Sequence, residues 1–429
     1  MDNDQAGAEI SIRATKARRR NISVALAIVV VIVIGVTAVV TTSGDNNSAR
    51  SGSTYTPGDP LAWTAVEGGG AHTCALVNSG QVKCWGQNTY GQLGDGTTGN
   101  RTTPVFVSDI STATSISTGY NHSCALLSDS RVKCWGENTY GQLGNGRNTT
   151  LLVPVFVSDI STATSISSGA SHSCALLAGG SIKCWGYNGY GALGSESTTN
   201  SNIPVSVVGI STVTSISTGY NHSCAVLSDG EAKCWGQNTY GALGNGAIGT
   251  NSNTPVAVLG ISTATSIGTG AYHSCAVLQG GDTRCWGYNA SGQLGNGVTG
   301  GNSGVPVEVT YAFPELDLSD GTPRIMDLSG GRSHSCAVLS GGQVTCWGDG
   351  SYGQLATGNT IVAFPQAVIN IPTTTGATAT SISLGSYHSC AVLSDASIEC
   401  WGYNVSGQLG NGTSGIYSNS DKPVSVPSP

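Results

Sequence analysis

Four short segments of alternating apolar and polar residues recur seven times along the chain, and each set predicts four β-strands. In the second copy they are Pro104 to Val107, Ala113 to Ser117, His122 to Leu127 and Arg131 to Trp135. Val, Ile and Thr dominate these segments, which is typical of strands. The first cysteines of successive copies are 50, 50, 50, 51, 61 and 54 residues apart, a period typical of propeller blades. The pattern therefore predicts an all-β fold, a seven-bladed β-propeller.

The last two segments of each copy are joined by three residues, which predicts a tight hairpin. The third of these residues is glycine in most copies: Gly80, Gly180, Gly230, Gly281 and Gly342. Glycine suits a type I turn followed by a left-handed residue. This register places Cys124 opposite Cys134 as a non-hydrogen-bonded pair, where side chains approach most closely.

A cross-strand disulfide is therefore expected in each copy, and the seven bridges would use all fourteen cysteines. The expected pairs are Cys74 with Cys84, Cys124 with Cys134, Cys174 with Cys184, Cys224 with Cys234, Cys275 with Cys285, Cys336 with Cys346 and Cys390 with Cys400.

All seven histidines lie two residues before a cysteine, so each His and Cys share one face of a strand. With the opposed second cysteine they form a possible three-ligand metal cluster, and free thiols are a further alternative to disulfides. The repeat supplies no fourth ligand, so we favour structural histidines that tie a strand to a neighbouring turn. Asp95-Gly96 and its counterparts are expected to be plain turns rather than calcium sites. The histidines are His72, His122, His172, His222, His273, His334 and His388.

The two ends of the repeat region suggest how the ring closes. The first copy begins at Leu61 without a preceding Pro-Val strand, whereas an unpaired strand of this kind, Pro423 to Val426, ends the chain. We therefore predict that the C-terminal strand completes the first blade, which would hide two open sheet edges.

An uncharged apolar segment, Ile22 to Val40, precedes the repeats. A helix of that length, at 1.5 Å per residue, spans a hydrocarbon core of about 30 Å. Basic residues flank its N-terminal side, so the N-terminus is expected to be cytoplasmic. We predict a basic segment at 1–21, a transmembrane signal-anchor helix at 22–40, a flexible linker at 41–60 and an extracytoplasmic propeller at 61–429. A cleaved signal peptide and a twin-arginine export signal are the alternatives, and both would also export the repeats.

The repeat resembles the regulator of chromosome condensation repeat. The residues that carry the resemblance are HSxAL, the turn glycine, WGxN, GQLGxG and the Pro-Val that follows. The resemblance covers about residues 61–429 and implies a seven-bladed propeller closed by strand exchange. Its founding member is a nuclear exchange factor for a small GTPase that also binds chromatin, and other members are secreted, including a bacterial inhibitor of a β-lactamase. This chain departs from the nuclear pattern in its apolar segment, its acidic repeats and its paired cysteines.

Charge argues against nucleic acid as a partner. The formal net charge is -7, and the first forty residues hold five Lys/Arg and three Asp/Glu, which leaves 12 minus 21, or -9, for the rest. Nucleic-acid binding depends on a basic patch. Seven equivalent histidines also do not form the single constellation that an active site needs, so we predict no catalytic residue, no metal, no cofactor and no enzyme activity.

We expect partner binding instead at the loops whose sequences differ between copies, because variable loops on a repeated scaffold commonly bind the partner. The loops after each Trp-Gly vary most, as in Asp95 to Thr103. We predict a monomeric, membrane-anchored scaffold for binding or adhesion, with a protein or glycan partner. A GTPase exchange factor and a cell-envelope enzyme are the alternatives. The candidate partner-binding residues are Tyr120, Tyr220, Tyr272, Tyr387, Tyr311 and Phe313.

Overall fold

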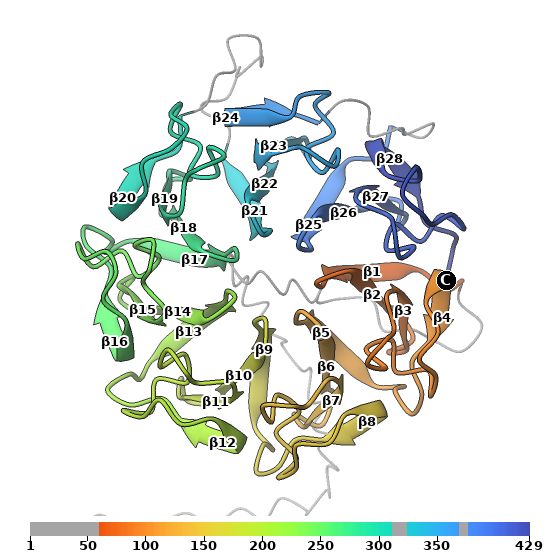
Figure 1. Cartoon of the computed structure of the whole chain (residues 1–429), viewed down its shortest axis with the longest axis horizontal. Helices are drawn as coiled ribbons and strands as arrows, with labels where there is room; N and C mark the ends of the chain where they lie inside the picture. The colour runs from red at the N-terminus through yellow and green to blue at the C-terminus, as the bar shows by residue number, and fades with distance from the viewer. Residues whose placement is uncertain (1–59, 311–323, 369–375) are drawn as a thin grey trace, which may run out of the picture. The chain divides into compact units, whose positions relative to one another are not determined.

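The computed structural model describes residues 60–310, 324–368 and 376–429, which form seven four-stranded antiparallel sheets set as blades around one axis (Figure 1). Each blade is one continuous stretch of chain. The predicted all-β seven-bladed propeller is therefore confirmed. The predicted segments at 1–21 and 22–40, and the predicted linker at 41–60 except its last residue, lie outside the described residues. Within the described part of the chain, no helix is long and apolar enough to cross a membrane.

The first two strands of each blade lie nearest the axis. The innermost strands are β1 (Trp63–Gly68), β5 (Ala113–Thr118), β9 (Ala163–Ser168), β13 (Val213–Thr218), β17 (Ala264–Thr269), β21 (Ile325–Gly330) and β25 (Ala379–Leu384). The second strands, which all begin with histidine, are β2 (His72–Val77), β6 (His122–Leu127), β10 (His172–Leu177), β14 (His222–Leu227), β18 (His273–Leu278), β22 (His334–Leu339) and β26 (His388–Leu393).

The last two strands complete each blade toward its rim. The third strands are β3 (Val82–Gly86), β7 (Val132–Gly136), β11 (Ile182–Gly186), β15 (Ala232–Gly236), β19 (Thr283–Gly287), β23 (Val344–Asp349) and β27 (Ile398–Gly402). The outer strands, which carry the Pro-Val sequences or their counterpart, are β4 (Arg101–Phe106), β8 (Leu151–Phe156), β12 (Ser201–Ser206), β16 (Ser252–Ala257), β20 (Ser303–Glu308), β24 (Ile361–Ala367) and β28 (Ser420–Ser425).

The central hairpin of each blade has the predicted register. In the second blade Cys124 lies opposite Cys134, and Leu127 N donates to the carbonyl of Arg131 at 2.9 Å. The third turn residue is left-handed, with φ of 63° at Ser130 and 79° at its counterpart Gly80. The turn glycines therefore adopt the left-handed backbone conformation that the sequence predicted for this position.

The prediction that the C-terminal strand completes the first blade is wrong. β28 pairs with β27 of its own blade, with Cys400 opposite Val424, and the first blade has its own outer strand, β4. The error is one of phase, because each Pro-Val strand belongs to the hairpin before it. The loop after the third strand turns the chain back, so the next segment pairs with that strand. There are seven hairpins and seven such strands whether each strand joins the hairpin before it or the one after it. Counting them therefore could not distinguish the two arrangements.

The last blade joins the first through side chains and turns. Thr73 Oγ1 and Trp85 Nε1 both donate to the Gln408 carbonyl, at 2.8 and 2.9 Å, and Ser386 N donates to the Gly69 carbonyl at 3.1 Å. At each of the remaining six interfaces, a hydroxyl and a tryptophan in the same two positions also donate to one carbonyl of the preceding blade. Closure therefore needs no exchanged strand, because the seventh interface repeats the other six.

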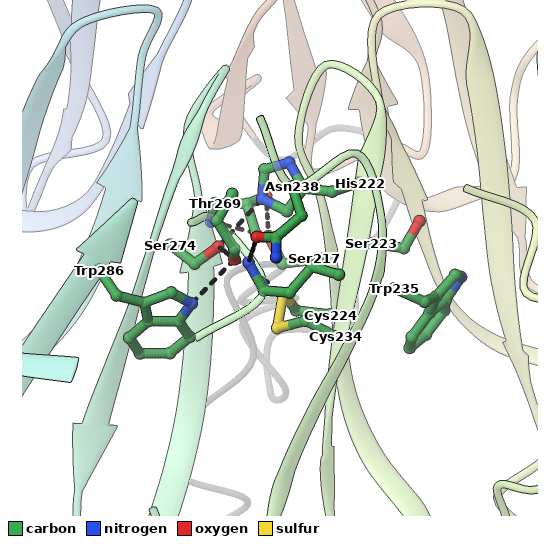
Figure 2. Close-up of a disulfide and its surroundings, with 12 residues drawn as sticks. Ser217, His222, Ser223, Cys224, Cys234, Trp235, Asn238, Thr269, Ser274 and Trp286 are labelled. Carbon is green, nitrogen blue, oxygen red and sulfur yellow. Dashed lines mark hydrogen bonds between the residues drawn. A yellow bond between two sulfur atoms is a disulfide. The ribbon is translucent and has the colours of Figure 1, made fainter. Parts of the chain in front are cut away.

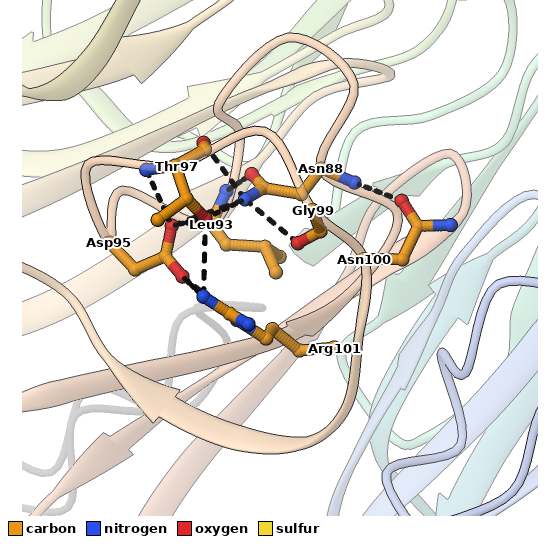
Figure 3. Close-up of polar contacts among 7 residues, drawn as sticks. All are labelled: Asn88, Leu93, Asp95, Thr97, Gly99, Asn100 and Arg101. Atoms are coloured by element: carbon orange, nitrogen blue, oxygen red, sulfur yellow. Dashed lines mark hydrogen bonds and ion pairs between the residues drawn. The ribbon is translucent and has the colours of Figure 1, made fainter.

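An asparagine holds the loop between the third and outer strands (Figure 3). Asn88 Oδ1 accepts from Leu93 N at 3.0 Å, and Asn88 Nδ2 donates to the carbonyls of Thr97 and Gly99 at 3.0 and 3.2 Å. Asp95 in the same loop accepts from Arg101 Nη2 at 2.8 Å. The Asp95 carboxylate is thus hydrogen-bonded to the chain segment of its own loop, which is consistent with a plain turn. No group of three or more metal-ligating side chains occurs among the described residues.

Candidate functional site

Each histidine joins two neighbouring blades. His222 Nε2 lies 2.9 Å from Ser274 Oγ of the next blade (Figure 2). Ser274 Oγ donates to the Ala242 carbonyl at 3.0 Å, so it accepts from the imidazole, and Trp286 Nε1 donates to the same carbonyl at 2.8 Å. Burial lowers the pKa of His222 to about 4, so the imidazole is neutral at ordinary pH.

The same hydrogen bond closes a full circle of seven. The pairs, at 2.8 to 3.1 Å, are His72–Ser123, His122–Ser173, His172–Ser223, His222–Ser274, His273–Ser335, His334–Ser389 and His388–Thr73. The partner is the second strand of the next blade, not a turn as we expected. We call these histidines, their hydroxyl partners and the blade tryptophans the interblade lattice.

The cysteines lie beside this lattice and form seven disulfides in the described residues, with no free cysteine among them. The bridges join Cys74 with Cys84, Cys124 with Cys134, Cys174 with Cys184, Cys224 with Cys234, Cys275 with Cys285, Cys336 with Cys346 and Cys390 with Cys400. This is the pairing that the hairpin register predicted, rather than free thiols or a metal cluster.

The geometry of the bridges follows from the strand register. The paired Cα atoms are 4.0 to 4.1 Å apart, the close approach expected of a non-hydrogen-bonded cross-strand pair. The second cysteine of every hairpin, such as Cys84 and Cys184, has no exposed surface. A bridged and buried sulfur offers no thiolate, so these cysteines are structural.

The turns after the innermost strands and the loops after the third strands share one end of every blade. Glu137 N donates to the Asn121 carbonyl and Tyr403 N to the Tyr387 carbonyl, both at 2.9 Å, which ties each loop to the adjacent turn. Of the fifteen tyrosines, Tyr55 and Tyr311 lie outside the described residues, and all the others are in these two kinds of segment. We call this end the tyrosine face: Tyr90, Tyr120, Tyr140, Tyr187, Tyr190, Tyr220, Tyr240, Tyr272, Tyr288, Tyr352, Tyr387, Tyr403 and Tyr417.

Tyr220 is central to this face. Its ring centroid lies 5.7 Å from that of Tyr120 and 5.5 Å from that of Tyr272, both with edge contacts. Its hydroxyl lies 3.3 Å from Ser386 Oγ of the seventh blade, so this side chain from the fourth blade reaches across the axis. Burial raises the pKa of Tyr220 to about 12. The structure thus brings together tyrosines from separate blades.

Arg332 completes the group and was missed by the sequence analysis. Its Cζ lies 5.9 Å from the Tyr220 ring centroid and 5.4 Å from that of Tyr387. Alignment on the histidines would have found it, because Arg332 lies two residues before His334, as Tyr220 lies two before His222. The axial cluster comprises Tyr120, Tyr220, Tyr272, Arg332 and Tyr387. Phe313, like Tyr311, lies outside the described residues.

Tyr120, Tyr220 and Arg332 of the axial cluster line an open pocket whose walls are the turns of all seven blades. Tyr120 N donates to the Ala170 carbonyl at 3.2 Å, and Ala170 N donates to the Tyr220 carbonyl at 3.3 Å, so backbone bonds join successive turns. A second cavity, between the innermost strands, is lined mostly by serine and threonine, with Glu67 as its one charged lining residue. Burial raises the pKa of Glu67 to about 8, although Ser383 Oγ donates to its carboxylate at 3.1 Å.

The closed ring of seven similar blades, with the tyrosines gathered at one end, defines a repeat propeller. The chain belongs to the RCC1-like domain family, whose model matches residues 6–318 and again 158–428. It is 31% identical over 174 residues to the probable E3 ubiquitin-protein ligase HERC6 of Homo sapiens, covering 40% of this chain and 16% of that protein. It is 33% identical over 147 residues to the ultraviolet-B receptor UVR8 of Arabidopsis thaliana, covering 34% and 31%. The chain thus spans less than a third of each relative's length.

Solved structures share the fold at low identity. Yeast RCC1 (Prp20) bound to Kap60 has a TM-score of 0.71 at 18% identity, covering 97% of this chain and 91% of that one. Prp20p of Saccharomyces cerevisiae, whose binding to Gsp1p and histones has been described, has a TM-score of 0.69 at 19% identity, covering 87% of each chain. Human WBSCR16 has a TM-score of 0.65 at 21% identity, covering 77% and 87%. These likenesses show the propeller fold.

Proposed function

We propose that this protein is a binding scaffold that docks a protein partner on its tyrosine face. The observation that carries the proposal is that every described tyrosine lies at this one end, with the axial cluster at its centre. Tyrosine and arginine are enriched in protein interfaces and dominate their hot spots. A tyrosine also presents a large contact area at a low cost in conformational entropy.

Exposure at this end supports the proposal. Tyr120 and Tyr140 are each 38% exposed, and Tyr417 is 96% exposed. Apolar side chains at the tips of the neighbouring loops are also exposed, including Ile248 and Ile416. Exposed aromatic and apolar side chains at one end of a propeller favour an interaction site there.

Related propellers support a protein rather than a nucleic acid as the partner. Yeast RCC1 binds Kap60, and Prp20p has described binding properties toward Gsp1p and histones. A guanine nucleotide exchange factor is the alternative within this family. It would need a cytosolic propeller, where thiols stay reduced.

We also infer that the propeller is tethered outside the cytoplasm. The apolar segment 22–40 and its basic N-terminal flank support an anchor, and seven disulfides suit an oxidising compartment. Protease treatment of intact cells should remove the propeller and leave a membrane-bound N-terminal fragment. A fully protected propeller would contradict the inference and favour the exchange factor.

Site-specific photocrosslinking tests the docking face. A photoreactive residue placed at Tyr140 of the full chain, expressed in its native cell, should give a discrete crosslinked protein band. The same residue at Asp129, an exposed hairpin position at the opposite end of that blade, is the matched control and should give none. Crosslinks from Asp129 alone, or a Tyr140 adduct that glycosidases remove completely, would contradict a protein partner on this face.

A further inference from the structure

We propose that the axial cluster takes a carboxylate of the docked protein, the side chain of an Asp or Glu in an acidic segment, onto the guanidinium of Arg332. This inference rests on the proposed function, because it names the chemistry that the partner presents to the centre of the tyrosine face.

Arg332 is the one charged side chain in the innermost ring of turn residues. The ring consists of the seven positions two residues before each histidine: Gly70, Tyr120, Ala170, Tyr220, Ala271, Arg332 and Ser386. Within the described residues the ion pairs are Arg101–Asp95 and Arg131–Asp129, so Arg332 has no carboxylate partner there. Its guanidinium carries five N–H donors in a planar fork that matches a carboxylate.

The tyrosines hold this guanidinium in place. Tyr220 and Tyr387 lie within 6 Å of its Cζ, at 5.9 and 5.4 Å, which is the range of a cation–π contact. Tyr220 is itself positioned by the contact of its hydroxyl with Ser386. An arginine stacked in this way is pre-organised, and less entropy is lost when it binds a carboxylate.

The surroundings favour a protein carboxylate over a polyanion. A nucleic acid or sulfated glycan gains its affinity from several cations, whereas the ring has one. Glu137, in a loop of the same face, and Asp349, at the adjoining end of β23, would repel an extended polyanion.

Peptide selection on the full chain tests the proposal with a defined probe. Random linear peptides displayed on phage should be enriched in Asp and Glu on the wild-type protein. Arg332→Gln should weaken the selected peptides about 10-fold or more, the scale of one lost charge-assisted hydrogen bond. Arg332→Glu should invert the selection toward Lys and Arg. The control Arg147→Gln removes an exposed arginine from an outer loop of the same face and should leave the selection unchanged.

The outcomes separate this inference from the proposed function. One outcome would overturn the carboxylate site and leave the docking face intact. In that outcome Tyr120→Ala abolishes binding of the selected peptides, but the peptides show no preference for acidic residues, or Arg332→Glu does not invert that preference. No peptide that depends on Tyr120, together with no crosslink from Tyr140, would overturn both. Tighter binding of polygalacturonate than of any peptide, lost in Arg332→Gln, would overturn the protein carboxylate in favour of a glycan. Unchanged melting temperatures of the variants establish that they fold.

Discussion

The interblade lattice and the tyrosine face are built on the same seven blades, but they differ in how much they vary. A histidine and a tryptophan of the lattice, with the two cysteines beside them, recur in every blade. Two residues before the histidine, the side chain changes from glycine to alanine, serine, tyrosine and arginine. The repeated part therefore supplies the geometry of the ring, and the varied part supplies any specificity.

Packing explains this difference. In the lattice there is no spare space, because a Cβ built on Gly119 would overlap the His122 ring and the Gly169 carbonyl. One residue further along, Tyr120 is 38% exposed and its side chain is free to change. Neighbouring positions in one turn thus face opposite constraints.

The largest expected effect is acid unfolding of the lattice. Burial lowers the pKa of the histidines from 6.5 to about 3 or 4, for example to about 3 in His122. The unfolded chain therefore takes up protons first, and stability that is full above pH 6.5 is lost as pH falls toward 3. Each histidine contributes at most about 1.4 kcal/mol per pH unit, and seven act together. Thermal melts between about pH 8 and pH 4 should show a steep fall below about pH 6.5.

Two acids, the partly buried Glu67 and the buried Asp327, affect the pH dependence of stability in the opposite direction. Burial raises the pKa of Glu67 to about 8 and that of Asp327 to about 6, so each contributes stability that grows as pH falls through its raised pKa. Glu67→Gln removes that gain and should leave the histidine-driven fall in place. A melting temperature that stays constant from about pH 6.5 to about pH 4.5 would contradict the assignment of the histidines as buried and neutral.

The next effect contrasts one aromatic residue from each region of the second blade. Trp135 is fully buried and donates to the Gln92 carbonyl at 2.9 Å, so Trp135→Ala should lower the free energy of unfolding by about 3 to 5 kcal/mol. Tyr140→Ala, on the tyrosine face, should cost less than about 1 kcal/mol. Urea unfolding of both variants measures the difference. Equal losses would show that the tyrosine face is part of the core.

A pair of glycines sharpens the contrast without removing any side chain. Gly119→Ala should destabilise by about 3 kcal/mol, because the added methyl group meets a histidine ring and a backbone carbonyl. Gly99→Ala places the same methyl group in open space in a loop of the first blade and should change the melting temperature little. If both variants melt like the wild type, the lattice is looser than described.

Among the changes to the buried part of the blades, loss of one disulfide has the smallest expected effect on stability. Cys124 and Cys134 are separated by 10 residues, and closing so short a loop stabilises by at most about 3 kcal/mol. The double variant with Cys124→Ala and Cys134→Ala should therefore still fold, with a melting temperature a few degrees lower. Intact mass after alkylation without reductant should show no labelled cysteine in the wild type. Fourteen labels would mean that the cysteines are reduced.

Local features of the fold could be predicted from the sequence. The hairpin turn, its register and the pairing of Cys124 with Cys134 depend on residues within one copy, where turn chemistry and side-chain alternation leave one solution. The blade to which each Pro-Val strand belongs could not be predicted from the sequence. The order of the segments along the chain is the same whether that strand joins the hairpin before it or the one after it. Only the way the long loop turns back decides this.

The axial cluster shows the same division at the tyrosine face. The amino-acid sequence determined that tyrosines precede several of the histidines and that an arginine takes this position once. Only the tertiary structure decided that Tyr220 contacts Ser386, 166 residues away, and lies beside Arg332. The reason is physical: closure of the ring brings the turns of all seven blades to one axis, where side chains remote in sequence meet. The sequence thus determined the blade, and closure decided what the blades present together.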